Sequence, residues 1–592
     1  MRNIGGIILQ TVLVLLMGAG MPLLAQTADT IRISYKCDTV DVTTDVEGLG
    51  VQVEGAHVCV SSAESELPLV VWLNGESGDG SLSVKGDRPS VLVLDGLSLA
   101  CKTGGVISLK GKATNTLLLA EGSENVLADT PCGEQKACVY SKATLTIDGG
   151  GSLSVKGNRQ HAMSSKHSVH IAASAGTIDL VCTADGGKAI KANDSLMIEG
   201  SRLMAQVSGN AAIGVDDGIV DTTKAAALKA DSLIAILGGE LSLTCTGSGS
   251  KCIVTDGMVI VGGQNGREEG TDGWPVVMCR NTGLIFGDEP TGDIDTQCKP
   301  KAIKADGTIT IHSGRISLYT SHEGGEGLES KTSIVINNGV IWAECYDDCI
   351  NTSGYIVMND GFVHCVSNGN DAIDTNIRDQ GTAALTLNGG TLLAYSAGGR
   401  HEEGIDVNRS AIQINGGYLF AIGGQQGGVE PKIRGSRAVA YLRGLDAVAG
   451  RYYTLVSDGR ALMTVLMPCN PTGRYALIAS NGLYRESACQ IEESLQPPLS
   501  EQSMQENCFW TGAHPAAAIG TYSWMQSGRY VKVDVACSPT GLDRPQGDAC
   551  PPCTVTYYTL GGMRLQTPPL HGAFIRNMTD KEGNIHNQKI TR

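Results

Sequence analysis

The sequence predicts an all-β fold, a solenoid in which short strands of successive turns stack in parallel. A short pattern of acidic and apolar residues returns four times between Glu326 and Asn408. Glycine is frequent, with 77 of 592 residues, while aromatic residues make up only 4%. Apolar pairs alternate on either side of glycine-rich bends, which is the pattern of short strands and tight turns. Repeats of roughly 20–50 residues are typical of solenoids, so one array can account for a chain of this length.

The register of the turns follows from one apolar position, called the mark residue, which always has a Gly, Ala or Cys directly before it. The mark residues are Val139, Met163, Ile190, Leu228, Ile253, Ile303, Leu328, Ile350, Ile373 and Ile405. Most intervals between them are 22 to 27 residues. Two strands, a bend and a longer return in this length fit one coil of a parallel β-helix, with coils about 4.8 Å apart. We therefore expect the mark residues to form one inward-facing column.

Residues 1–25 are predicted to be a secretory signal peptide. Arg2 precedes the apolar run 7–17, and a small-residue exit ends at Ala25. The apolar run is too short for a stable bilayer anchor, and no later stretch is long and apolar enough for a transmembrane helix. We therefore expect an exported protein that does not span the membrane.

Four further segments follow from changes in the pattern. Residues 26–85 alternate weakly and are expected to cap the N-terminal end, and 86–437 to form the parallel β-helix. Residues 438–537 are expected to form a C-terminal β-rich cap or small domain, and 538–592 a linker and tail. The interval of 50 residues between Ile253 and Ile303 predicts an insertion, which is either a functional lobe or a surface excursion.

The 19 cysteines allow two interpretations in an exported protein. Cys138, Cys252 and Cys349 stand directly before mark residues, in the slot that small residues fill elsewhere, which favours buried free thiols. Cys345 and Cys365 are expected to share a later position in successive turns. Stacked neighbours would be close enough to form a disulfide, so the choice between thiols and disulfides stays open.

Two positions that flank the mark residues change from basic to acidic at the same turn. Two residues before the mark, Lys301 is followed by Glu326 in the next turn, and one residue after it, Lys304 is followed by Glu329. Equivalent positions stack in a solenoid, so later turns present a column of carboxylates that repel one another. Calcium binds about six to eight oxygen atoms with tolerant geometry and would relieve this repulsion. The candidate metal ligands are Glu326, Glu329, Asp348, Asp371, Asp374, Glu403 and Asp406.

The charged column suggests ways of binding a polysaccharide, beside the simpler interpretation of a solvated acidic edge. A uronate chain would bind through calcium and through Lys301 and Lys304. A neutral glucan would need aromatic faces, for which Trp274 and Tyr346 are candidates. Because aromatic residues are few, binding through charge is favoured. The net charge of −16 argues against a nucleic-acid surface, which needs basic stripes.

The segments KAIKANDSLMIEG (188–200), KAIKADGTITIHSG (301–314), EGLESKTSIVINNG and DDCINTSGYIVMNDG carry a family resemblance. Residues from about 90 to 430 resemble the bacterial carbohydrate-binding domain family of right-handed parallel β-helix proteins. The resemblance implies calcium binding and an acidic or cellulosic plant polysaccharide as ligand, without a demonstrated lyase role. The high cysteine content and the insertion after Ile253 depart from the family pattern and leave the ligand open.

The tail from Val555 to Lys589 resembles a C-terminal sorting domain of the type IX secretion pathway. The resemblance rests on Tyr558 to Arg564 (YTLGGMR) and on Gly572 to Ile575 (GAFI). It implies the secretion machinery as a partner and a final location at the cell surface, outside the cell or in the periplasm.

The function expected from the sequence is that of an exported, non-catalytic, calcium-assisted protein that binds acidic polysaccharides. One alternative is a surface adhesin or structural solenoid without a sugar ligand. A second is a calcium-dependent polysaccharide lyase, which needs a Lys or Arg base near the metal. Lys331, Arg378, Arg400 and Arg409 are near the acidic turns in the sequence, and nothing singles out one of them as that base.

Overall fold

The computed structural model describes residues 28–540, except 45, 63–64, 66, 217–218, 264–272, 289–295, 378–380, 426–430, 499–503 and 516, and the strands of 555–591. The signal peptide predicted for residues 1–25 lies outside the described residues. The described residues are all-β, without an α-helix. The chain divides into two compact units, Met1–Ser538 and Pro539–Arg592.

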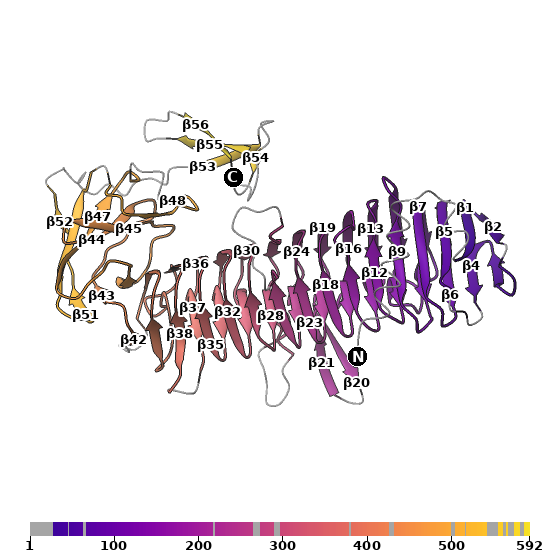
Figure 1. The fold of residues 1–592 in the computed structure, drawn as a ribbon, viewed down its shortest axis with the longest axis horizontal. Helices are drawn as coiled ribbons and strands as arrows, with labels where there is room; N and C mark the ends of the chain where they lie inside the picture. Colours follow the sequence, from indigo (N-terminus) through magenta and orange to yellow (C-terminus); the bar gives the residue numbers. More distant parts are fainter. Residues whose placement is uncertain are drawn as a thin grey trace. The chain divides into compact units, whose positions relative to one another are not determined.

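Each complete turn of the first unit contributes one strand to a 13-stranded sheet and two strands to a 30-stranded sheet (Figure 1). The 13-stranded sheet is named the first column, and from β4 onward its neighbours pair in parallel. Its strands are β3 (Gly50–Glu54), β4 (Ala56–Ser61), β6 (Gly80–Lys85), β8 (Ile107–Leu109), β11 (Ala137–Ser141), β14 (His161–Ser165), β17 (Lys188–Ala192), β22 (Ala226–Ala230), β25 (Lys251–Thr255), β28 (Lys301–Ala305), β31 (Glu326–Ser330), β34 (Ile350–Thr352) and β37 (Ile373–Thr375).

The 30-stranded sheet contains two more parallel columns, both of which follow β7 (Ser90–Cys101). The second column is β9 (Asn115–Leu119), β12 (Leu145–Asp148), β15 (Val169–Ile171), β18 (Ser195–Ile198), β23 (Leu233–Ile236), β26 (Met258–Val261), β29 (Ile309–Ile311), β32 (Ser333–Ile336), β35 (Tyr355–Met358), β38 (Ala383–Leu387), β40 (Ala411–Ile414) and β42 (Lys432–Gly435). The third is β10 (Glu124–Asp129), β13 (Ser152–Gly157), β16 (Thr177–Cys182), β19 (Arg202–Val207), β24 (Glu240–Cys245), β27 (Val276–Asn281), β30 (Arg315–Thr320), β33 (Val340–Cys345), β36 (Phe362–Ser367), β39 (Thr391–Ser396) and β41 (Tyr418–Gly423).

The mark residues stack as the sequence predicts. Ile303 pairs with Leu328, Leu328 with Ile350, and Ile350 with Ile373 in successive parallel strands of the first column. All four side chains are buried and belong to one hydrophobic cluster that extends along the stack. This confirms the register, and with it the alignment of the flanking charged positions.

Antiparallel strands close the N-terminal end of the stack. β1 (Asp29–Lys36) pairs in parallel with β5 (Leu69–Ser77) and antiparallel with β2 (Thr39–Thr44). β3 pairs antiparallel with β4. Residues 29–85 therefore contain the first stacked strands together with β2 and β3, which cover edges that would otherwise be open to association with another chain.

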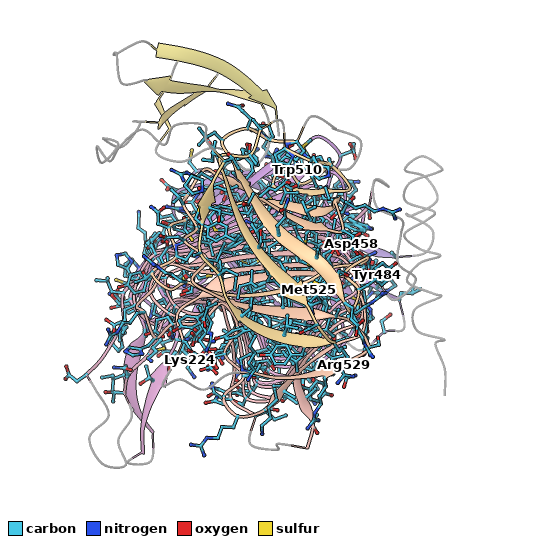
Figure 2. All side chains as sticks on the ribbon, turned by 90° about the vertical axis from the view of Figure 1, so that its left-hand side faces the viewer. Lys224, Asp458, Tyr484, Trp510, Met525 and Arg529 are labelled. Carbon is cyan, nitrogen blue, oxygen red and sulfur yellow. The ribbon has the colours of Figure 1, made fainter. Side chains whose placement is uncertain are left out.

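The C-terminal end of the stack is closed in a similar way. β46 (Tyr475–Ala479) pairs antiparallel with both β41 and β43 (Val439–Arg443), and β51 (Tyr530–Asp534) pairs with β43. A seven-stranded sheet follows, made of β44 (Tyr452–Ser457), β45 (Arg460–Leu466), β47 (Ser487–Ser494), β48 (Met504–Gln505), β49 (Phe509–Thr511), β50 (Gly520–Gln526) and β52 (Ser538–Pro539). Figure 2 looks onto this end of the unit, where Tyr484 and Met525 are exposed.

The second unit contains one four-stranded antiparallel sheet. Its strands are β53 (Val555–Thr559), β54 (Arg564–Leu565), β55 (Ala573–Thr579) and β56 (Ile585–Thr591). Of the residues that carry the sorting-domain resemblance, 560–563 and 572 lie outside the described residues. Among the residues that the structure describes, no helix has the length and apolarity needed to cross a membrane.

The two longest intervals between mark residues contain additions to ordinary turns. The interval from Ile253 to Ile303 holds β26 and β27, which pair with their neighbours like any other turn. The extra residues fall on either side of β27, partly outside the described residues. The interval from Ile190 to Leu228 holds a hairpin of β20 (Ala212–Asp216) and β21 (Ile219–Thr223).

The cysteines that the structure describes form no disulfide bond with one another. Cys138, Cys252 and Cys349 are fully buried before their mark residues, in the slot predicted for small residues. The prediction that Cys345 and Cys365 share one position is wrong, because Cys345 pairs with Ser367 and Cys365 with Ala343. The two strands begin at the same offset of 12 residues from their mark residues, but Cys345 lies 17 residues after Leu328 and Cys365 only 15 after Ile350, so the two thiols occupy different inward-facing positions of their strands.

Substitution of Cys349 tests how tightly this slot is packed. We expect Cys349→Leu to lower the free energy of unfolding by about 1–3 kcal/mol, because added methylene groups in a filled core force side chains and backbone apart. The thiol lies 3.6 Å from the carbonyl oxygen of Ala343, which leaves little room. Cys349→Ala should have a smaller effect, and thermal denaturation of the two variants is the measurement. An alanine variant as unstable as the leucine variant would contradict the packing argument.

Candidate functional site

The two charged positions lie side by side along the first column. On the side before the mark residue, Lys251 pairs with Lys301 and Lys301 with Glu326. On the side after it, the pairing runs from Lys304 through Glu329, Asn351 and Asp374 to Asp406. The change from basic to acidic residues therefore occurs between neighbouring strands β28 and β31.

At that junction lysines neutralise the first two carboxylates. Lys301 Nζ lies 2.6 Å from Glu326 Oε1 and 3.5 Å from Glu329 Oε2, and Lys301 is only 4% exposed. Lys304 Nζ lies 2.8 Å and Lys331 Nζ 2.7 Å from Glu329 Oε1. Glu326 and Glu329 thus already have fixed cations beside them. The sequence held the signal for this, because a base-to-acid change in stacked positions must bring Lys301 next to Glu326.

The protonation behaviour of the junction follows from these ion pairs. Burial acts against charge on Glu329, but Lys301 and Lys304 hold its pKa well below the usual range. Burial works against the charge of Lys301, and the adjacent glutamates overcome it and raise the pKa of that ammonium. The pKa of Glu326 is raised, mainly by burial, and its Oε2 has no hydrogen-bond partner. The junction is therefore a tightly packed group of charges with little access to solvent.

Asp348 lies one turn further along, and no lysine or arginine is ion-paired to it among the residues that the structure describes. It is 2% exposed, and its Oδ2 accepts a hydrogen bond of 2.8 Å from Asn351 Nδ2. Its Oδ1 is buried without a hydrogen-bond partner. Burial raises the pKa of Asp348 to about 10, and the charges of nearby acidic residues act in the same direction. A cation placed near Asp348 would stabilise the ionised form of its carboxyl group.

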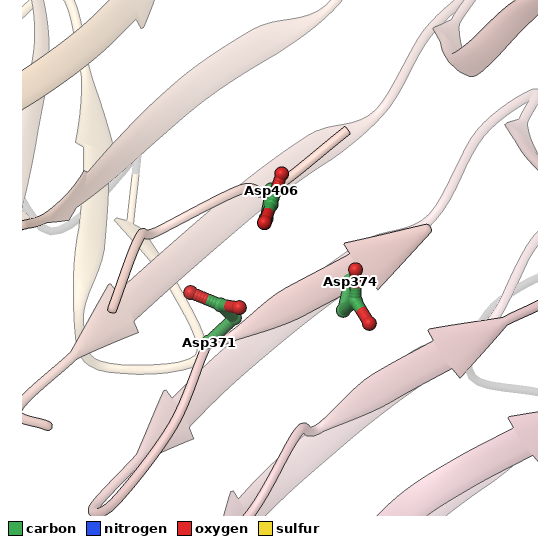
Figure 3. Close-up of side chains that lie close together, drawn as sticks. All are labelled: Asp371, Asp374 and Asp406. Carbon is green, nitrogen blue, oxygen red and sulfur yellow. The ribbon is translucent and has the colours of Figure 1, made fainter. Parts of the chain in front are cut away.

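Asp371, Asp374 and Asp406 come together at the end of the acidic column (Figure 3). One carboxylate oxygen from each lies within 4.8 Å of the others. Asp374 is the central residue of β37, and Asp406 bridges to it from the next turn. Asp371 precedes β37, where the chain bends at Ala372 before the strand begins. This bend is what brings residues three apart to the same side.

Polar neighbours orient the three carboxylates. The backbone N–H of Glu403 donates to Asp371 Oδ1. Asn376 Nδ2 donates to Asp374 Oδ2 at 2.5 Å, and the backbone N–H of Asn408 donates to Asp406 Oδ1 at 2.5 Å. Each bond leaves acceptor capacity on the carboxylate, which offers about four lone-pair positions. The amide oxygens of Asn376 and Asn408 lie within the same two turns and could serve as further ligands for a cation.

Burial also raises the pKa values of this cluster. The pKa of Asp371 is raised to about 8 and that of Asp374 to about 7, in both cases mainly by burial, with the charge of Asp406 acting in the same direction. Three partly buried carboxylates this close favour either protons or a cation between them.

The remaining predicted residues lie in different places. Glu403 is half-buried beside Asp371, to which its backbone N–H donates. Tyr346 is 41% exposed in the loop before Asp348, and its ring packs against Gly369, where a Cβ would lie 2.7 Å from Tyr346 Cε1. Tyr346 is therefore an accessible aromatic side chain close to the acidic turns. Trp274 lies on another edge of the stack, where it lines a groove with Tyr418. Lys301 is buried among glutamates and Lys304 is ion-paired, so both lysines neutralise carboxylates of the protein itself.

The raised pKa values predict a pH dependence of the calcium-free protein. A carboxyl whose pKa is raised on folding stabilises the protein below its unfolded pKa of about 4, and that contribution is lost as the pH rises toward its folded pKa. For Asp374 and Asp371 this window runs from about pH 4 to pH 7 and 8. Without calcium, the melting temperature should therefore be lower at pH 7.5 than at pH 5.

Calcium bound by these carboxylates would favour their ionised form, so a stabilising effect of calcium would run the opposite way. We expect the increase in melting temperature on adding calcium to be larger at pH 7.5 than at pH 5, because fewer protons must be displaced. Differential scanning calorimetry with and without calcium at both pH values measures this difference. Comparing the calcium-induced changes in melting temperature at the two pH values removes the contribution of titrating groups elsewhere. One such group is Lys188, whose pKa is lowered to about 7 by burial. An equal effect of calcium at both pH values would contradict the assignment.

Known proteins share sequence similarity with the stacked turns of this chain. Residues 54–372 match the family described as carbohydrate-binding domain-containing protein. A carbohydrate-binding domain-containing protein of Acetivibrio thermocellus is 28% identical over 129 residues, which are 20% of this chain and 45% of that relative. The match therefore spans less than half of the relative. A solved structure described as the polysaccharide lyase-like protein from C. thermocellum shares 16% identity at a TM-score of 0.28, covering 66% of this chain and 100% of that one.

Proposed function

We propose that this chain, which belongs to the family of carbohydrate-binding domain-containing proteins, binds acidic polysaccharides with the help of calcium. The single observation that carries the proposal is the cluster of Asp371, Asp374 and Asp406, whose carboxylate oxygens lie within 4.8 Å of one another. No lysine or arginine side chain is ion-paired to these three residues within the described part of the chain. The cluster thus has the donor set and the excess negative charge that a hard divalent cation requires.

The proposal includes the architecture and the location. The stacked parallel columns support a right-handed parallel β-helix, with coils capped at both ends. The N-terminal apolar segment supports export, and the sequence of the tail supports delivery by a type IX secretion machinery to the cell surface, the extracellular space or the periplasm.

Calcium would be held by carboxylate oxygens of Asp371, Asp374 and Asp406, with amide oxygens of Asn376 or Asn408 and water completing the shell. Bound calcium supplies a positive charge that the polysaccharide's carboxylates can share. The chain's own residues position that charge, since the bond from the Glu403 N–H orients Asp371 and the bond from Asn376 orients Asp374. Asp348 and Glu326, one and two turns away, extend the same negative column.

A uronate polymer needs such a bridge because the protein carries a net charge of −16. A polyanion is repelled by an acidic edge, and a cation shared between the two makes the interaction attractive at that place. The exposed ring of Tyr346 gives an apolar face on which a sugar ring can lie next to the cluster. The lysines of the junction contribute by keeping Glu326 and Glu329 neutralised.

Two measurements on the mature chain test this function. Isothermal titration calorimetry should detect calcium binding at or below millimolar concentration, and the protein should bind immobilised polygalacturonate in calcium but not in excess chelator. Calcium binding without polygalacturonate binding would support the proposed metal site and contradict the proposed polysaccharide ligand. Absence of calcium binding would overturn the proposal in favour of a structural solenoid or adhesin with a solvated acidic edge.

The lyase alternative lacks a suitable base among the described basic residues near the acidic turns. Lys331 is ion-paired with Glu329, which raises its pKa, whereas a base that removes a proton at neutral pH needs a lowered pKa. The guanidinium of Arg400 contacts the neighbouring His401, with Nε 3.5 Å from His401 Nε2. Arg378 lies outside the described residues. Incubation with polygalacturonate and calcium should therefore produce no absorbance from unsaturated uronate.

A further inference from the structure

A groove of about 750 Å³ lies on a different edge of the stack, where the second column turns into the third. Its floor consists of residues 338–339, 360–361, 388–390 and 415–417 of four stacked turns, each of which ends with Gly. The closing glycines have φ values between 74° and 117°, a region that favours glycine. The groove is thus built by the repeat itself, and its size falls within the roughly 300–1,000 Å³ of ligand sites.

A ladder of asparagine amides runs along the same four turns, and its members Asn388 and Asn415 line the groove. Asn359 Nδ2 donates to Asn337 Oδ1, Asn388 Nδ2 to Asn359 Oδ1, and Asn415 Nδ2 to Asn388 Oδ1, each at 2.8 Å. These bonds fix the orientation of every amide. Each amide still has a second N–H and each amide oxygen a second lone pair, so Asn388 and Asn415 present donors and acceptors to the groove at the spacing of the turns.

Aromatic and charged side chains line the groove above this floor. Trp274 and Tyr418 are both half-buried, with ring surface that is partly accessible. Asp360 is exposed, and its Oδ1 accepts a hydrogen bond of 2.8 Å from the N–H of Gly361, which leaves acceptor capacity. Arg437 is anchored by a bond of 3.1 Å from its Nε to the carbonyl oxygen of Asn415.

The outer wall comes from residues far away in the sequence. Gln505 Oε1 accepts a hydrogen bond of 3.2 Å from Thr391, and Glu506 Oε1 lies 3.0 Å from Arg315 Nη1. These contacts hold residues 504–506 against the third column, so the groove has a defined width. Its charges nearly cancel, since Asp360 and Glu506 are balanced by Arg437 and by Arg315, the ion-pair partner of Glu506.

We propose that this groove binds an uncharged oligosaccharide, independently of calcium. Fixed amides and a carboxylate match the hydroxyl groups of a sugar, the faces of Trp274 and Tyr418 match its apolar C–H surfaces, and a balanced charge gives no attraction for a polyanion. The regular spacing of the ladder suits a ligand that itself repeats. This site is separate from the carboxylate cluster, which lies in the first column, and it does not depend on the calcium proposal.

The test uses cellohexaose, xylohexaose and mannohexaose as probes, with calorimetry in excess chelator so that the carboxylate cluster cannot contribute. We expect the unaltered chain to bind at least one of the three, and both Trp274→Ala and Asp360→Ala to weaken that binding about tenfold or more. Tyr355→Ala, which removes an exposed ring outside the groove, is the matched control and should leave the affinity unchanged. Asp360 is exposed, so its variant remains informative if Trp274→Ala is unstable.

Each outcome decides the proposal. Binding of none of the three probes at millimolar concentration overturns it, and so does binding that both groove variants leave unchanged. The groove variants should retain calcium-dependent binding of polygalacturonate, because they leave the carboxylate cluster intact. Loss of polygalacturonate binding together with oligosaccharide binding in both groove variants would overturn the separation of the two sites.

Discussion

Lys301→Met is expected to lower the free energy of unfolding by about 3–5 kcal/mol, which exceeds the loss expected for Cys349→Leu. Removing one member of a buried ion pair leaves the other charge without compensation in a medium of low polarity. Lys301 Nζ is 2.6 Å from Glu326 and 3.5 Å from Glu329, and Glu326 has no other ion-pair partner among the described residues. Urea and thermal denaturation measure the loss.

A second variant separates charge from packing. Lys301→Met combined with Glu326→Met replaces the pair by apolar side chains of similar length, and it should recover most of the lost stability, because a well-packed apolar pair is often as stable as a buried ion pair. Lys331→Met is the control, since its side chain is 52% exposed and its ion pair with Glu329 should contribute about 1 kcal/mol or less. A loss below about 1 kcal/mol for Lys301→Met would contradict the importance of the junction.

Asp371→Asn combined with Asp374→Asn is expected to abolish the stabilisation of the protein by calcium. For the unaltered chain, calcium at 100 times its dissociation constant should stabilise the folded state by about 2.7 kcal/mol, and chelator should remove this effect. The double variant loses two of three carboxylates in the cluster and should melt at the same temperature in calcium and in chelator. Binding of polygalacturonate should fall with it.

In the calcium-free state, the same double variant is expected to be more stable than the unaltered chain. Two unit charges about 4.8 Å apart repel by roughly 3 kcal/mol at an effective dielectric constant near 20, and the amides remove this repulsion. In chelator at pH 8 the double variant should therefore melt at a higher temperature than the unaltered chain. Asp95→Asn with Asp306→Asn removes the same charge from exposed positions elsewhere and should change neither comparison. Calcium stabilisation that survives in the cluster variant would place the metal elsewhere.

Much of the fold was determined by the sequence alone. In a stack of parallel strands each turn repeats the environment of the one before, so small and apolar side chains recur at fixed offsets and the register can be read directly from Ile303, Leu328, Ile350 and Ile373. The same periodicity placed the acidic residues in line. Positions within regular strands are predictable because strand geometry fixes their spacing and direction.

Only the tertiary structure decided what happens between and across the strands. The bend at Ala372 brings Asp371 to the side of Asp374, although residues three apart in a straight strand face opposite sides. Lys301 is buried by the surrounding turns and becomes a counter-ion for glutamates, where the sequence suggested a sugar contact. The groove forms because residues 504–506 fold back onto turns more than a hundred positions earlier. Loop paths and long-range contacts depend on the packing of the whole chain, and no local pattern of residues specifies them.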